Sequence, residues 1–166
     1  MKIFKRGLFL GLLFILAGVL IACSEDGKDT KKDDGKVPTS VDGSKVEEVT
    51  IGFTGPLSGP AAFYGEETLK GLEMAAKEIN DSGGFEVDGK KYTINLATLD
   101  DKYLPNEAAA NAKRLVQEED SKFIYTPHSG GVYAMQVFNE MEDFIVMAYT
   151  SEPGVTAQGN KLTVRI

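Results

Sequence analysis

Two adjacent pairs of side chains have the residue types that catalysis or metal binding requires. His128 stands beside Ser129, a base next to a hydroxyl, which is the chemistry of a hydrolase. Neighbours in sequence rarely present a base to a nucleophile, and no acid that would orient the imidazole is evident, so catalysis by this pair is disfavoured. Asp100 and Asp101 would need further oxygen ligands to hold a cation. We therefore interpret one aspartate as capping or stiffening a loop and the other as solvated.

A third group has the chemistry of anion binding. Ser129, Gly130 and Gly131 stand at the start of an expected helix. Glycines there let backbone N–H groups approach an anion closely, the helix dipole adds attraction, and the serine hydroxyl adds a hydrogen bond. This arrangement suits a ligand carboxylate. The alternative is a plain N-cap followed by glycine turn residues.

Two further polar clusters are expected at the same edge of the fold. Tyr64 opens an earlier helix, and Tyr149, Thr150 and Ser151 follow a strand and offer hydroxyls and carbonyls. Taken alone, Tyr64 could be a packing residue and the other three could be turn residues. Three polar clusters converging on one edge favour a ligand-binding site over any of these separate explanations.

Alternating strands and helices must position these clusters. Short β-rich runs alternate with apolar spacings of three and four residues, which predicts an α/β fold with a parallel sheet flanked by helices on both faces. In such sheets ligands bind at the carboxyl ends of the strands, here the loops 54–63, 100–105, 127–131 and 149–160. The expected strands are 49–53, 92–99, 122–126, 144–148 and 162–166, and the expected helices are 64–82, 106–119 and 132–142.

Composition narrows the function further. The 166 residues carry 25 acidic and 18 basic side chains, a net charge of −7 that disfavours nucleic acid as a partner. One cysteine and one histidine exclude an intrachain disulfide, a cysteine-based zinc cluster and a multi-histidine metal site. Glycine-rich nucleotide-binding motifs are absent. We therefore predict neither a metal nor a cofactor.

The amino terminus has the features of an export signal. Residues 1–22 are a short basic segment followed by an uncharged apolar run, which is typical of a signal peptide. Leu20-Ile21-Ala22-Cys23 resembles the lipobox of bacterial lipoproteins, which implies a lipidated Cys23 and an extracytoplasmic chain anchored to the bacterial membrane. An ordinary secretory signal or a short membrane anchor is the alternative. Residues 23–47, the lipidated cysteine and a polar stretch behind it, are expected to form a flexible tether.

The folded part, residues 48–166, resembles a known family. The segment 51–60 (IGFTGPLSGP), Tyr64-Gly65 and the run 105–116 (PNEAAANAKRLV) are similar to the opening of branched-chain amino-acid-type solute-binding proteins. These are the receptors of ABC importers and have the type I periplasmic-binding fold. The resemblance implies that Ser129 and the glycine N–H groups take a ligand's α-carboxylate. It also implies that the Tyr149 carbonyl and the Ser151 hydroxyl take the α-ammonium, and that Tyr64 closes over the ligand.

The same resemblance implies an incomplete binding protein. In that family two α/β lobes close over the ligand, and residues 48–166 correspond to part of the N-terminal lobe, so we expect the sequence to be a fragment or a truncated product. Such an open half-site is expected to bind weakly by itself. The predicted function is the solute-binding component of an ABC importer that delivers an amino acid or a related zwitterion or amide to a permease, and not an enzyme. The alternatives are a ligand-sensing receptor of the same fold and, less favoured, a secreted hydrolase.

Overall fold

The structure, a computed structural model, describes residues 46–157 and 159–166. The predicted signal peptide, Cys23 and nearly all of the predicted tether lie outside these residues. The last residue assigned to the tether, Glu47, is already the first residue of a strand.

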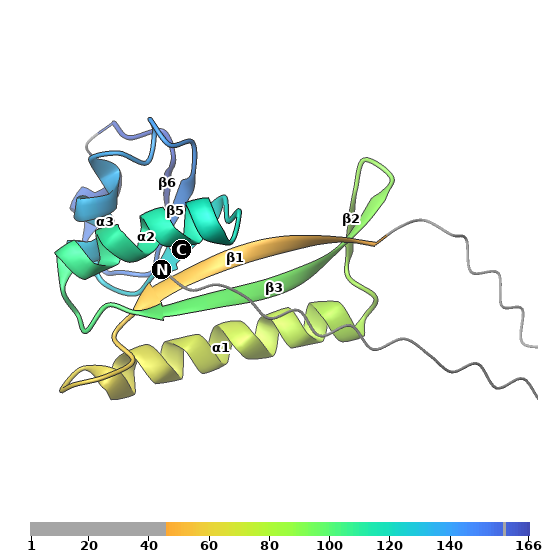
Figure 1. Cartoon of the computed structure of the whole chain (residues 1–166), viewed down its shortest axis with the longest axis horizontal. Coiled ribbons are helices and arrows are strands. Elements are labelled where there is room, and N and C mark those ends of the chain that lie inside the picture. The colour runs from red at the N-terminus through yellow and green to blue at the C-terminus, as the bar shows by residue number, and fades with distance from the viewer. Residues whose placement is uncertain (1–45, 158) are drawn as a thin grey trace, which may run out of the picture. The chain divides into compact units, whose positions relative to one another are not determined.

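A six-stranded sheet in the order β2-β3-β1-β4-β5-β6 forms the centre of the fold (Figure 1). All neighbouring strands run parallel except β2 and β3, which pair antiparallel. The predicted parallel sheet is therefore confirmed, with one antiparallel strand added at its edge. The strands are β1 (Glu47–Gly55), β2 (Phe85–Val87), β3 (Lys90–Asp100), β4 (Phe123–Thr126), β5 (Ile145–Ala148) and β6 (Thr163–Arg165).

The antiparallel strand β2 is absent from the sequence-based expectation. Asp88 and Gly89 form the two-residue turn between β2 and β3, and both have positive φ angles, 51° and 77°. The strand itself has three residues, all exposed. Its residues, Phe85-Glu86-Val87, are too few for an alternation of apolar and polar side chains to predict a strand, and only the Asp-Gly turn signalled it.

Helices cover both faces of the sheet, as predicted. Helix α1 (Ala62–Asp81) packs on β3 from one side, whereas α2 (Pro105–Glu118) lies against β1 and β3 on the opposite side (Figure 1). Helix α3 (Ser129–Gln136) packs beside α2 and on β5. A short 3₁₀ helix, η1 (Pro153–Thr156), precedes β6.

Helix α3 begins and ends earlier than the predicted range 132–142. It begins at Ser129 because the side chain of His128 caps it, so the glycines belong to its first turn instead of to a preceding loop. It ends at Gln136, and the chain then turns: the N–H groups of Phe138 and Asn139 both donate to Met135 O, and the Asn139 side chain donates to Phe144 O. The predicted continuation to residue 142 is therefore wrong.

The main core lies between the sheet and helices α2 and α3. It forms where β4 and β5 meet the apolar faces of these helices, and close approach is possible because β1 carries Gly52 there. A Cβ at Gly52 would lie 2.7 Å from Ile124 Cδ1. The buried members of this core are Ala112, Leu115, Ile124, Val132, Met135, Phe138, Phe144, Val146, Ala148 and Val155.

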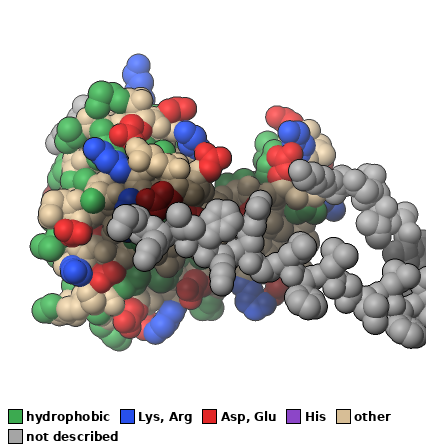
Figure 2. All heavy atoms as spheres, in the orientation of Figure 1, with side chains coloured by type: hydrophobic (Ala, Val, Ile, Leu, Met, Phe, Trp, Pro, Cys, Tyr) green, Lys and Arg blue, Asp and Glu red, His purple; other side chains and the backbone are tan. Residues whose placement is uncertain are grey.

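The face toward α1 carries a row of aromatic rings. Phe53 stacks on Tyr125 with ring centroids 5.9 Å apart, and Tyr125 lies 6.2 Å from Tyr149. Figure 2 shows the outer surface in the same orientation as Figure 1, with acidic and basic side chains interspersed among apolar ones.

Candidate ligand-binding site

The carboxyl ends of the parallel strands meet at one edge of the sheet. In register, Gly55 at the end of β1 lies beside Asp100 at the end of β3, and Thr126 of β4 lies beside Ala148 of β5. The loops predicted to form the site therefore do leave the same edge.

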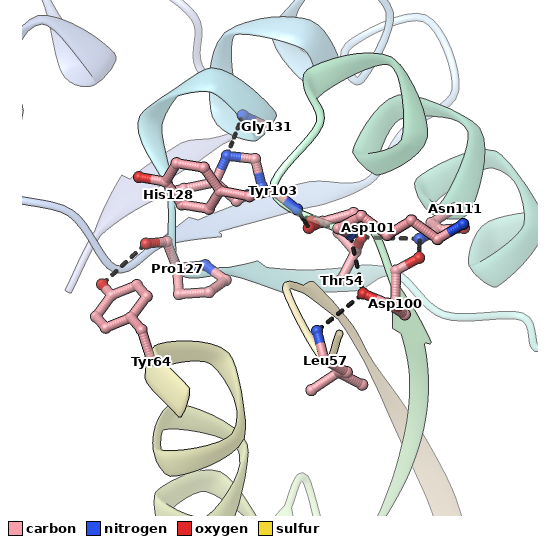
Figure 3. A network of polar contacts seen from close by, with 11 residues as sticks. Thr54, Leu57, Tyr64, Asp100, Asp101, Tyr103, Asn111, Pro127, His128 and Gly131 are labelled. Atoms are coloured by element: carbon pink, nitrogen blue, oxygen red, sulfur yellow. Dashed lines mark hydrogen bonds and ion pairs between the residues drawn. The ribbon is translucent and has the colours of Figure 1, made fainter. Parts of the chain in front are cut away.

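Tyr64 lies in the first turn of α1 and reaches across this edge. Its hydroxyl donates a 2.9 Å hydrogen bond to the carbonyl oxygen of Pro127, just before α3 (Figure 3). The residue remains 43% exposed, so it can still contact a ligand. Burial of the hydroxyl raises the pKa of Tyr64, and the nearby phenols of Tyr149 and Tyr103 raise it further.

The first turn of α3 carries the predicted anion-binding groups. His128 is the N-cap, and its Nδ1 accepts a 3.0 Å hydrogen bond from the Gly131 N–H. The N–H groups of Ser129 and Gly130, which have no acceptor inside the helix, have no other partner among the described residues. Of the two glycine amides predicted to bind an anion, that of Gly130 is therefore free in this structure, whereas that of Gly131 is bonded to His128, which contradicts its predicted role. The Ser129 amide, which was not singled out from the sequence, is free in its place.

Close packing explains why glycines occupy this turn. A Cβ at Gly130 would lie 3.0 Å from Pro105 Cγ at the start of α2. A Cβ at Gly131 would lie 2.9 Å from the ring of His128 and 3.0 Å from Thr126 Oγ1. That Thr126 hydroxyl is buried without a hydrogen-bond partner among the described residues.

The buried pair formed by His128 and Asp101 excludes the hydrolase chemistry considered from the sequence. Nε2 of His128 lies 2.9 Å from Asp101 Oδ2, and Nδ1 is occupied by the Gly131 N–H (Figure 3). Neither ring nitrogen is available to take a proton from Ser129. The histidine here holds structure and does not serve as a general base.

The sequence indicated that one aspartate stiffens the loop; in the structure both do, and Asp100 remains partly exposed. Asp101 is fully buried, and Asp100 accepts hydrogen bonds from the N–H groups of Leu57 and Lys102 and from the Ser58 hydroxyl. Burial acts to raise the pKa of Asp100, but these three hydrogen bonds outweigh it and hold the pKa below its usual value. Together the two carboxylates fasten the loop after β1 and the loop after β3.

Residues 149–151 form the remaining part of the edge. Tyr149 is 46% exposed, and its N–H donates to Thr126 O. The Thr150 hydroxyl accepts from the Glu152 N–H. A hollow of about 380 Å³ is lined by Tyr64, Tyr149, Thr150, Ser151 and Ile166, so the structure does bring Tyr64 together with this cluster.

Sequence reasoning missed Tyr103, which lies beside the predicted site. Its ring packs on His128 with centroids 4.7 Å apart, and 51% of the residue is exposed. Lys102 and Tyr103 both have positive φ angles, 53° and 65°. The N–H of Tyr103 donates to Asp101 Oδ1 at 2.8 Å, which holds this unusual backbone in place. The sequence carries no signal for this arrangement beyond the neighbouring aspartates.

The described part of the chain has neither a membrane-spanning helix nor a cluster of metal-binding side chains. Residues 46–157 and 159–166 contain no helix long and apolar enough to cross a membrane. In the same ranges, no three side chains of His, Cys, Asp or Glu come together as a metal site.

Comparison with known proteins identifies the class to which this fold and site belong. Residues 48–161 match the family described as Periplasmic binding protein. The chain belongs to this family. Its membership confirms the resemblance noted from the sequence and the prediction of a binding protein in place of an enzyme.

Relatives named for amino acids support the branched-chain type. An amino acid binding protein of Pseudomonas aeruginosa is 34% identical over 117 residues, covering 69% of this chain and 30% of the relative. A Leu/Ile/Val-binding protein homolog of Brucella abortus is 33% identical over 119 residues, covering 70% of this chain and 31% of the relative. The chain thus spans about a third of the length of these curated relatives.

Solved structures share the fold. The branched-chain amino acid transporter substrate binding protein LivJ of Streptococcus pneumoniae, solved with isoleucine, is 28% identical with a TM-score of 0.63, covering 72% of this chain and 33% of LivJ. A solute binding protein of an ABC transporter from R. palustris, solved with 4-hydroxybenzoate, is 19% identical with a TM-score of 0.58, covering 72% of this chain and 31% of that one. The second likeness shows the fold alone.

Proposed function

We propose that this chain is part of an extracytoplasmic solute-binding protein that captures an amino acid, or a related small zwitterion or amide, for an ABC permease. Residues 48–166 would supply the contacts of the N-terminal lobe. Cys23 would carry the lipid that anchors the chain to the membrane. The names of the relatives and of LivJ support the amino-acid class of ligand.

One observation carries the proposal. The N–H groups of Ser129 and Gly130 are unpartnered within the described residues, at the positive end of α3 and on the edge where the strands end. A carboxylate placed there would accept hydrogen bonds from both amides and from the Ser129 hydroxyl, with the helix dipole adding attraction.

The cluster at residues 149–151 suits a cationic group. Within the described residues, neither the Tyr149 carbonyl oxygen nor the Ser151 hydroxyl has a hydrogen-bond partner. An α-ammonium is a donor of three hydrogen bonds and would be satisfied by such oxygens. Tyr64, held on the same edge by Pro127, would cover the ligand.

A titration followed by NMR tests the ligand class. L-isoleucine, isoleucinamide and 4-hydroxybenzoate are added at millimolar concentration to the isotope-labelled full chain in detergent. We expect isoleucine to shift the amide resonances of Ser129 and Gly130, with weak affinity because the site is open. Isoleucinamide, which lacks the carboxylate, should shift them less. Shifts confined to other parts of the chain, or none with any carboxylate, would contradict the proposal.

Mass spectrometry of the native protein tests the anchor. The membrane fraction should yield a protein that begins at Cys23 and carries acyl chains, and a Cys23→Ala variant should no longer be acylated or cut at that position. An unmodified cysteine in the native protein would rule out the lipid anchor. The amino-acid ligand would be unaffected by that result.

A further inference from the structure

A single buried carboxylate ties together three segments of the candidate site. Asp101, which is fully buried, accepts from the Thr54 hydroxyl at 3.1 Å, from the Tyr103 N–H at 2.8 Å and from His128 Nε2 at 2.9 Å. These donors come from β1, from the loop after β3 and from the cap of α3. Asn111 of α2 adds a fourth element by donating to the Thr54 hydroxyl at 3.2 Å.

The hydrogen bonds of His128 fix where its ring proton lies. Nδ1 accepts from the Gly131 N–H, so this nitrogen carries no hydrogen. The hydrogen is therefore on Nε2 and is donated to Asp101. The result is a chain of polarised groups that runs from the carboxylate through the imidazole to an amide of the first turn of α3. Since each hydrogen bond strengthens the next, Asp101 makes Nδ1 a better acceptor.

This series of hydrogen bonds determines which amides in the first turn of α3 are free. The cap takes only the third amide of the turn, that of Gly131, and the amides of Ser129 and Gly130 keep no partner among the described residues. The ring of Tyr103 covers the imidazole, and His128 itself is only 4% exposed. A buried, doubly bonded cap has little freedom, so the turn it holds is preorganised.

We propose that His128 and Asp101 are positioning residues for the ligand's carboxylate. Neither touches the ligand, and they act by fixing the first turn of α3 so that its two free amides meet the carboxylate without reorganisation. This inference rests on the proposed function. It adds two residues to those that the sequence singled out for binding.

The single histidine of the chain makes the arrangement directly observable. With ring-¹⁵N-labelled histidine, NMR of the full chain should show a protonated Nε2 and an unprotonated Nδ1. Adding L-isoleucine should shift the Nδ1 resonance, because the ligand's carboxylate polarises the same turn of helix. Isoleucinamide should produce a smaller shift. An opposite tautomer, or an Nδ1 signal that isoleucine leaves unmoved while Ser129 responds, would overturn the proposal.

Variants separate positioning from simple stability. His128→Ala should weaken isoleucine binding roughly tenfold, because the turn loses its cap. His128→Asn keeps an N-cap oxygen and should recover part of that loss. Asp101→Asn should weaken binding as well and should change the ring ¹⁵N signals. The control is Asn80→Ala, which removes two 2.8 Å hydrogen bonds to the backbone of Ile94 at the far end of α1.

The outcomes distinguish a failure of the positioning role from a failure of the proposed function. The control variant should lower the stability of the chain but leave isoleucine affinity unchanged. If the wild-type chain binds isoleucine and the His128 and Asp101 variants bind it equally well, the positioning role is wrong and the proposed function stands. If the Asn80→Ala control loses as much isoleucine affinity as the His128 and Asp101 variants for the same loss of stability, the loss reflects stability alone. The positioning role is then also wrong. Absence of binding by the wild-type chain would overturn both.

Discussion

Tyr64 and Pro127 are joined by a 2.9 Å hydrogen bond, although they are 63 positions apart in the sequence. The donor is a phenol in the first turn of α1, and the acceptor is the last carbonyl but one before α3. The bond therefore fixes the distance between the residue expected to cover a ligand and the helix end expected to hold its carboxylate.

Tyr64→Phe should remove the hydrogen bond between Tyr64 and Pro127. Because the bond is partly exposed, we expect a loss of about 0.5–1 kcal/mol in the free energy of unfolding. Affinity for isoleucine should fall as well. Urea denaturation and NMR titration measure the two effects. Tyr92→Phe is the matched control, because the Tyr92 hydroxyl has no hydrogen-bond partner among the described residues and its ring packs on Phe85 at the β2–β3 hairpin. Equal effects of both variants would contradict this prediction.

Gly65→Ala should disrupt the junction between α1 and the loop after β1. A Cβ at Gly65 would lie 1.9 Å from the carbonyl oxygen of Pro56, so the backbone must move. We expect a destabilisation of about 2–3 kcal/mol. Gly71→Ala is the control in the same helix, where a Cβ meets nothing within 4 Å. That change should stabilise the chain by up to about 1 kcal/mol, because alanine favours the helix. Thermal unfolding of both variants would reveal opposite signs.

Asp100→Asn should remove an acid-sensitive part of the stability. Hydrogen bonds lower the pKa of Asp100 below 3.8 in the folded chain, although burial opposes them, so the unfolded chain takes up the proton first as the pH falls. The stabilisation from the carboxylate is therefore complete above about pH 4 and is lost as the pH drops through the folded-state pKa. The difference in urea midpoint between wild type and variant should be largest at about pH 6 and should shrink progressively as the pH is lowered below 3.8. A constant difference would refute this reading.

Tyr125→Phe should reduce the sensitivity to alkali. Burial, with the phenols of Tyr149 and Tyr64, raises the pKa of Tyr125 from 10.0 to about 12. For an acid whose pKa is raised by folding, the stabilisation is present below pH 10 and is lost between 10 and about 12. Ultraviolet titration of the native chain should show a phenol that ionises near pH 12, later than Tyr64, whose pKa is also raised, and the variant should lack it. In urea this late ionisation should vanish, because the ring is no longer buried.

Much of the fold follows from local patterns in the sequence. Ala108, Ala112 and Leu115 recur at helical spacing, which predicted α2 and its packing face, and all three are buried. The edge strand β2 could not be predicted in the same way, since its residues are exposed and its pairing depends on β3. The start of α3 was placed too late because glycines in a helix resemble a loop until their neighbours are known.

The hydrogen bonds around Asp101, at the centre of the site, could not be predicted from the sequence. The partners of Asp101 lie 27 positions away, at His128, and 47 positions away, at Thr54. No local pattern links such residues, so the sequence did not show which of the two aspartates is buried or that His128 is bonded to it. Their burial follows from the sheet order, which places the ends of β1, β3 and β4 side by side.

The sheet order also bears on the sequence of events in which the chain folds. Among the described strands β1 comes first in the sequence, and it lies inside the sheet with β3 on one side and β4 on the other. Ile51 pairs with Leu96 and also with Phe123. The second pairing closes a longer stretch of chain than the first, so it costs more conformational entropy. Until β4 has joined the sheet, one edge of β1 lacks a partner and is open to pairing with another extended chain.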